Sequence, residues 1–214
     1  MAAGGVARRE RLALCALFTR VGPDAPTLCE GWLTRDLAAH LVARELYPMS
    51  IPGMTVALLH PLTERYERMA LEQFDYPELV ERLRQGPPLT SPVGLPGARE
   101  AVNIHEFFVH HEDVRRANGA RPRRLSAALE TALWRRLRVM GPYLFRSMAG
   151  CSVRLENNTG RAMTVLPGAA GRLTLRGPTG ELFLFAFNRR AAARVDVAGD
   201  ERGLQRLAGV RLGV

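Results

Sequence analysis

The sequence predicts an α+β protein, in which a bundle of helices is followed by a small domain of strands and short helices. Up to residue 149, apolar residues recur at the three- and four-residue spacing of amphipathic helices. From residue 150 the pattern alternates with a period of two, and the segment 157–160 (Asn-Asn-Thr-Gly) separates two such runs as a hairpin turn does. We therefore expect two domains, residues 1–149 and residues 150–214.

Proline and glycine divide the first domain into segments of helical length. We expect helices over residues 6–20, 36–45, 61–73, 77–85, 98–117 and 127–148. Thr34 is expected to cap the second of these and Ser126 the last, because both side chains accept hydrogen bonds from free backbone N–H groups. On the third helix, Leu62, Tyr66 and Met69 are expected to face inward.

The second domain reads as four strands and two helices. The expected strands are residues 152–156, 162–166, 172–175 and 194–197, and the expected helices are 181–187 and 201–207. Asn188 is expected to close the first of these helices in the left-handed conformation, which asparagine tolerates.

The formal charge of the 214-residue chain is +9, which by itself suggests an anionic partner. However, all 30 basic residues are arginine, as in proteins of GC-rich genomes, and they are scattered without the interleaved aromatic residues of a single-strand binder. We therefore do not expect nucleic-acid binding. No apolar run approaches the roughly 20 residues that span a bilayer, and the first residues do not have the order of a secretory signal, so we expect a cytoplasmic protein without membrane association.

One segment combines three of the five histidines with three carboxylates, residues 102–114, which is expected to be helical. Glu106 and His110 are four residues apart, so they project from the same face of the helix and can hold one metal ion. His40, on the helix expected over residues 36–45, is the natural third ligand. Three nitrogen and oxygen ligands leave one coordination position open, which is the arrangement of catalytic zinc sites.

Each of these residues also has a simpler interpretation. His40 is equally well explained as a core imidazole bonded to a backbone carbonyl, and Glu106 with His110 as a solvated surface pair. Cys29 precedes the His40 helix and could approach the metal, although a buried structural thiol is the favoured interpretation.

The other polar residues of the segment are expected outside the ligand set. His105 and His111 point away from Glu106 and are expected at the surface or behind the ligands. Asp113 is either an outer partner or alternative ligand of the metal, or it forms a surface ion pair with Arg116.

Taken together, four motifs resemble a known superfamily. They are Thr27-Leu-Cys-Glu-Gly-Trp32, Arg35-Asp-Leu-Ala-Ala-His40-Leu, Glu106-Phe-Phe-Val-His110-His-Glu-Asp113 and Glu181-Leu-Phe-Leu-Phe-Ala-Phe-Asn-Arg-Arg190. The chain resembles the mycothiol-dependent maleylpyruvate isomerase and DinB-like superfamily, and more closely an actinobacterial metal-binding branch of it without a settled function. The resemblance implies a DinB-like four-helix bundle that holds a divalent metal, usually zinc, through His40, Glu106 and His110.

The characterised enzymes of that superfamily use a low-molecular-weight thiol, which in actinobacteria is mycothiol. The resemblance therefore implies a zinc-dependent enzyme that activates such a thiol toward an electrophilic substrate, for isomerisation or thiol transfer. Arg189 or Arg190 would then pair with a carboxylate of the cofactor or substrate, unless both merely stabilise a helix end. The alternative function is a non-catalytic metal-binding sensor or accessory protein of the same fold, and a homodimer is one of the oligomeric states left open.

Overall fold

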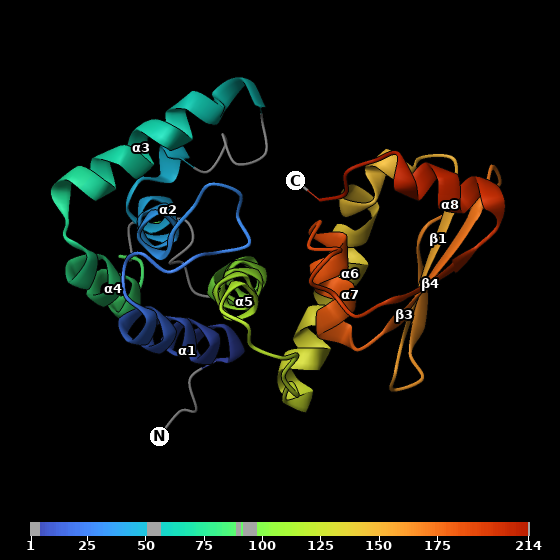
Figure 1. Cartoon of the computed structure of the whole chain (residues 1–214), viewed down its shortest axis with the longest axis horizontal. Helices are drawn as coiled ribbons and strands as arrows, with labels where there is room; N and C mark the ends of the chain where they lie inside the picture. The colour runs from blue at the N-terminus through green and yellow to red at the C-terminus, as the bar shows by residue number, and fades with distance from the viewer. Residues whose placement is uncertain (1–4, 51–56, 89–90, 92–97, 214) are drawn as a thin grey trace. The chain divides into compact units, whose positions relative to one another are not determined.

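The computed structural model describes residues 5–50, 57–88, 91 and 98–213. The chain forms two compact units, residues 1–121 (unit 1) and residues 122–214 (unit 2). Unit 1 is helical, whereas unit 2 combines helices with a four-stranded sheet, so the predicted α+β class is confirmed (Figure 1). The boundary between the units precedes the expected boundary at 149/150 by one long helix, which packs in unit 2 and not in the bundle.

Unit 1 contains five α-helices among its described residues. They are α1 (Val6–Val21), α2 (Thr34–Leu46), α3 (His60–Gln73), α4 (Tyr76–Gln85) and α5 (Ala98–Ala117). Two short 3-10 turns, η1 (Pro48–Ser50) and η3 (Ala57–Leu59), lie between α2 and α3. Helix α1 packs against α4 and α5, while α2 packs against α3 and α4. Large apolar side chains such as Phe18, Leu37 and Phe107 fill the core between them.

Two local predictions for unit 1 are wrong. Thr34 is the first residue of α2 and not its cap; its hydroxyl donates to the carbonyl of Gly22, and Asp36 accepts the N–H of Leu33 at 2.9 Å. On α3 the buried face carries Thr63 and Ala70, whereas the expected inward residue Met69 is 37% exposed. Leu62 and Tyr66, also expected to face inward, are half-buried, so the prediction fails for Met69 alone.

Unit 2 is built around a sheet with the strand order β2-β1-β3-β4. Its elements are α6 (Ala127–Leu144), the turn η5 (Arg146–Met148), β1 (Ser152–Asn157), β2 (Ala162–Leu166), β3 (Arg172–Gly177), α7 (Thr179–Ala186), β4 (Asp196–Gly199) and α8 (Glu201–Ala208). Strand β1 is antiparallel to β2 and parallel to β3, and β4 is antiparallel to β3. The alternate residues Val153, Leu155, Leu173 and Leu175 are buried, while α6 packs against α7 and β2.

The predicted order of elements in unit 2 is confirmed, although α7 begins at Thr179 and not at residue 181. Strand β4 begins at Asp196 and not at residue 194. Ser126 caps α6, because its hydroxyl accepts the N–H of Leu129 at 3.3 Å. Asn188 follows α7 with φ of 64°, the left-handed conformation expected for it.

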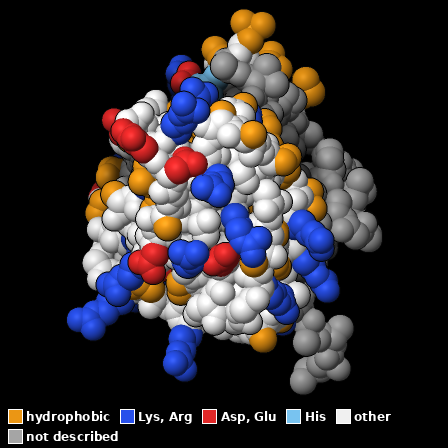
Figure 2. All heavy atoms as spheres, turned by 90° about the vertical axis from the view of Figure 1, so that its right-hand side faces the viewer, with side chains coloured by type: hydrophobic (Ala, Val, Ile, Leu, Met, Phe, Trp, Pro, Cys, Tyr) orange, Lys and Arg blue, Asp and Glu red, His pale blue; other side chains and the backbone are white. Residues whose placement is uncertain are grey.

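The charge of the chain is divided unequally between the two units. Residues 122–214 contain 16 arginines and six acidic residues, a net charge of +10, while residues 1–121 contain 14 arginines and 15 acidic residues, a net charge of −1. Figure 2 shows the side of the molecule where the sheet lies in Figure 1, with arginines spread over that face and acidic side chains between them. Among the described residues, no helix has the length and apolar character needed to cross a membrane.

Candidate metal centre

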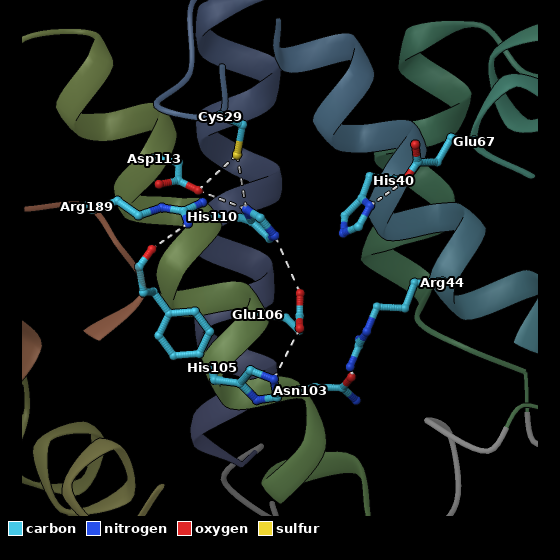
Figure 3. Close-up of polar contacts among 11 residues, drawn as sticks. Cys29, His40, Arg44, Glu67, Asn103, His105, Glu106, His110, Asp113 and Arg189 are labelled. Atoms are coloured by element: carbon cyan, nitrogen blue, oxygen red, sulfur yellow. Dashed lines mark hydrogen bonds and ion pairs between the residues drawn. The ribbon is translucent and has the colours of Figure 1, made fainter. Parts of the chain in front are cut away.

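The three residues expected to bind a metal come together between α2 and α5. His40 projects from α2, and Glu106 and His110 project from one face of α5 (Figure 3). Each offers one ligand atom, and these atoms all lie within 4.8 Å of one another. Residues 66 positions apart in sequence therefore meet at one point, in the largely buried interior of unit 1.

His40 is held by a carboxylate of a third helix. Its Nδ1 atom lies 2.7 Å from Oε1 of Glu67 on α3. The ring of Trp32 lies against it, with centroids 5.1 Å apart, and the ring of His110 is edge-on at 5.5 Å. The partner of His40 is thus a side-chain carboxylate and not the backbone carbonyl of the alternative interpretation.

His110 is held in the same way from its own helix. Its Nδ1 atom lies 3.0 Å from Oδ2 of Asp113, while its Nε2 atom lies 3.5 Å from Oε2 of Glu106. Asp113 is completely buried. Arg116 pairs instead with Glu112 at 2.7 Å, so the alternative interpretation of Asp113 as a surface partner of Arg116 is wrong. Asp113 lies behind the candidate ligand His110.

Glu106 is ionised in its buried position. Burial opposes its charge, but the guanidinium of Arg44 and hydrogen bonds from His105 and His110 outweigh burial and hold the pKa of this carboxyl well below its ordinary value. The nearest of these contacts is from His105, whose Nε2 atom lies 3.1 Å from Oε1. Arg44 itself donates to Oδ1 of Asn103 at 2.7 Å. A carboxylate in this state can accept a cation.

The surroundings of His110 also favour positive charge. Burial lowers the pKa of its imidazole, but Asp113, Cys29 and Glu106 together raise that pKa well above its ordinary value. The two acidic neighbours thus place negative charge on both sides of the ring, at Nδ1 and at Nε2. Such surroundings suit either a proton or a metal cation.

Cys29 lies beside this arrangement on the loop between α1 and α2. Its thiol donates to Oδ2 of Asp113 at 3.3 Å, and its Sγ atom is 3.9 Å from Nδ1 of His110. Cys29, His110 and Asp113 therefore form a second group of potential ligands that shares His110 with the first. Cys29 is half-buried, so it is less enclosed than the favoured structural interpretation supposed.

The remaining histidines have other partners. His111 is buried on the side of α5 that faces α1, and its Nδ1 atom lies 2.7 Å from Oε1 of Glu10. His105 is buried beside Glu106, so a surface position is wrong for both histidines, while the alternative of a position behind the ligands is confirmed for His105. His60 is exposed at the start of α3 and pairs with Glu64.

Arg189 and Arg190 follow α7 in unit 2, and both bind backbone carbonyls. Arg189 donates to the carbonyl of Phe187 at 2.8 Å. Arg190 donates to the carbonyls of Leu207 and Val210 at 2.8 and 2.7 Å, and burial lowers the pKa of its guanidinium. Arg190 thus stabilises the end of α8. The alternative role given above, stabilisation of a helix end, therefore fits Arg190, although the helix is α8 and not α7.

Glu67 is the site residue that sequence reasoning missed. It stands on the same face of α3 as the buried Thr63 and Ala70, four residues after one and three before the other. A carboxylate on the buried face of a helix was therefore the available signal. It was hidden because the pattern of apolar residues on α3 does not show that position 67 lies on that face.

Comparison with known proteins supports the fold. No profile of a known protein family matches the chain, and no curated protein sequence does. Two crystal structures of the mycothiol-dependent maleylpyruvate isomerase match the chain. The structure of a histidine-to-alanine mutant has a TM-score of 0.60, and the other structure has a TM-score of 0.56. The chain has the fold of that isomerase. Each match covers 92% of this chain and 90% of the other at 14% sequence identity, so it is the architecture that is shared.

Proposed function

We propose that this protein is a divalent-metal-dependent enzyme that activates a low-molecular-weight thiol of the mycothiol type. The observation that carries the proposal is the convergence of His40, Glu106 and His110, whose ligand atoms lie within 4.8 Å of one another. The 3.5 Å between His110 Nε2 and Glu106 Oε2 is close to the roughly 3.3 Å expected between atoms bound about 2.0 Å from a tetrahedral zinc ion.

The donor set is compatible with zinc, the metal of our proposal. Two imidazoles and one carboxylate are ligands that zinc accepts, and three protein ligands leave a position for an exogenous group. When bound, such a cation supplies Lewis acidity, which lowers the pKa of a coordinated thiol toward neutrality. A thiolate is the nucleophile that either a cis–trans isomerisation or a thiol transfer to an electrophilic substrate requires.

The chain's own residues supply the setting for this chemistry. Trp32 covers one side of the His40 ring, which shields the centre from bulk water. Arg44 balances the negative charge of Glu106. Arg189 and Arg190 remain our candidates for pairing with a carboxylate of the thiol or substrate, since a guanidinium binds a carboxylate through two parallel hydrogen bonds.

Metal analysis tests the ligand set. We expect the purified protein to hold one divalent ion per chain, and His40→Ala, Glu106→Ala and His110→Ala to lose it. His60→Ala is the matched control, since His60 is an exposed histidine of the same unit. Unchanged metal content in the three ligand variants would refute the proposed centre.

Turnover separates an enzyme from a passive binder. Incubation of the metal-loaded protein with mycothiol and an electrophile such as maleylpyruvate should give metal-dependent turnover that His110→Ala abolishes. A protein that holds metal stoichiometrically but turns over neither isomerisation nor thiol-transfer substrates would instead be the non-catalytic sensor or accessory protein.

A further inference from the structure

We propose that Glu67 and Asp113 are positioning residues of the metal centre, each fixing one ligand histidine so that its Nε2 atom is presented to the metal. The inference rests on the proposed metal-binding function. It adds to that function two carboxylates that do not themselves bind the ion.

The first pair is Glu67 with His40. The Oε1 atom of Glu67 lies 2.7 Å from Nδ1 of His40, and an ionised carboxylate only accepts hydrogen bonds. A carboxylate acceptor beside Nδ1 favours the tautomer with the proton on that atom, which leaves the lone pair of the ring on Nε2. Figure 3 shows Glu67 and the Glu106–His110 pair on opposite sides of the His40 ring. The carboxylate thus fixes both the tautomer and the direction of the ring.

The second pair is Asp113 with His110. Oδ2 of Asp113 lies 3.0 Å from Nδ1 of His110, and Nε2 of the same ring faces Oε2 of Glu106. The same Oδ2 atom accepts the thiol of Cys29 at 3.3 Å. Cys29 therefore contacts the carboxylate of Asp113. It lies on the side of the His110 ring away from the three converging ligand atoms.

The placement of Glu67 favours a functional role over a structural one. Its side chain is 16% exposed and stands on the buried face of α3 with Thr63 and Ala70. Burying a carboxylate beside an imidazole costs free energy that an apolar residue in the same place would not. The charge is explained if the imidazole is a ligand, since metal-binding histidines commonly donate their other N–H to a carboxylate.

The test is the metal affinity of the full-length protein, measured with zinc in competition with a chromogenic chelator. We expect Glu67→Ala and Asp113→Ala to bind one ion with an affinity lowered about 10- to 100-fold. Glu67→Gln should recover part of the loss, because its amide oxygen can accept the same Nδ1 hydrogen. Glu64→Ala is the control, since Glu64 lies one turn earlier on α3, more than half exposed, and pairs with His60.

Cobalt substitution provides a readout that a merely structural role would not change. The visible absorption of bound Co²⁺ reports the geometry of its ligands, so Glu67→Ala should alter the spectrum while Glu64→Ala reproduces that of the wild type. A thiolate-to-cobalt charge-transfer band that disappears in Cys29→Ser would put the ion on the Cys29 side of His110. That result would overturn the role of Asp113.

Failure of the inference and failure of the proposed function look different. If the wild-type protein binds no metal, the function fails. If it binds one ion and the Glu67 and Asp113 variants match its affinity and cobalt spectrum, the function stands and the positioning role is refuted. Should the completely buried Asp113 prove necessary for folding, the Glu67 variants decide the question alone.

Discussion

Gly141 of α6 lies directly against Val165 of β2. A β-carbon placed on Gly141 would be 2.7 Å from both Cβ and Cγ1 of that valine, which is closer than any two carbon atoms pack. The helix can approach the sheet this closely because residue 141 has no side chain. This contact explains why α6 belongs to unit 2.

The first expectation concerns this contact. Gly141→Ala should lower the free energy of unfolding of unit 2 by about 1–3 kcal/mol, because the added methyl group overpacks the junction. Chemical denaturation followed by a probe in unit 2, such as the fluorescence of the buried Trp134, would measure it. Adding Val165→Ala should recover part of the loss; a loss unaffected by that second change would show that the clash is not its cause.

The second expectation concerns a buried ion pair in unit 1. Arg11 reaches both carboxylate oxygens of Glu45, at 2.5 and 3.2 Å, and its guanidinium lies 4.6 Å from the centre of the Phe107 ring. Arg11→Met or Glu45→Leu alone should destabilise unit 1 by about 3–5 kcal/mol, because either removes the oppositely charged partner of a buried ion. The double variant should lose less than either single one, as a denaturation-based mutant cycle would reveal. Additive losses would contradict this coupling.

The third expectation concerns metal removal. All three proposed ligands lie in unit 1, so a bound ion should stabilise that unit and leave the unfolding of unit 2 unchanged. At a free metal concentration about 100 times the dissociation constant, the gain is about 2.7 kcal/mol. Calorimetry with and without a chelator measures this shift, and His110→Ala should show none. Equal shifts in both units would indicate binding elsewhere.

The fourth expectation concerns the cysteines. Cys29 is half-buried, whereas Cys15 and Cys151 are buried, and burial raises the pKa of the Cys15 thiol to about 12. Iodoacetamide should therefore modify Cys29 first in the native protein, and mass spectrometry of the digested protein would identify the site. Cys29→Ser should remove the fast phase of modification. A fast phase that persists in Cys29→Ser would mean that Cys15 or Cys151 becomes accessible without global unfolding.

The sequence allowed the α+β class, the order of elements and the convergence of His40 with Glu106 and His110 to be predicted. The four-residue spacing on α5 follows from helix geometry alone. His40 was the natural third ligand for that pair, and the resemblance to a known superfamily implied the same three residues. The left-handed Asn188 was predictable because few residues tolerate that conformation.

The rest depended on how helices pack, which local patterns do not encode. The partnership of Glu67 with His40 depends on the rotation of α3 against α2, and the exposed Met69 gave a misleading face. The predicted boundary at 149/150 followed the change from helical to strand patterning, whereas the compact units divide at 121/122. The apolar stripe of α6 fits a bundle as well as it fits a sheet, and the bare backbone at Gly141 favours the sheet.

The unequal division of charge has a practical consequence for handling the molecule. Retention on a cation exchanger at neutral pH should be governed by residues 122–214, and a fragment that ends at residue 121 should hardly be retained. Because the screening length is only about 8 Å at physiological ionic strength, added salt should weaken that retention.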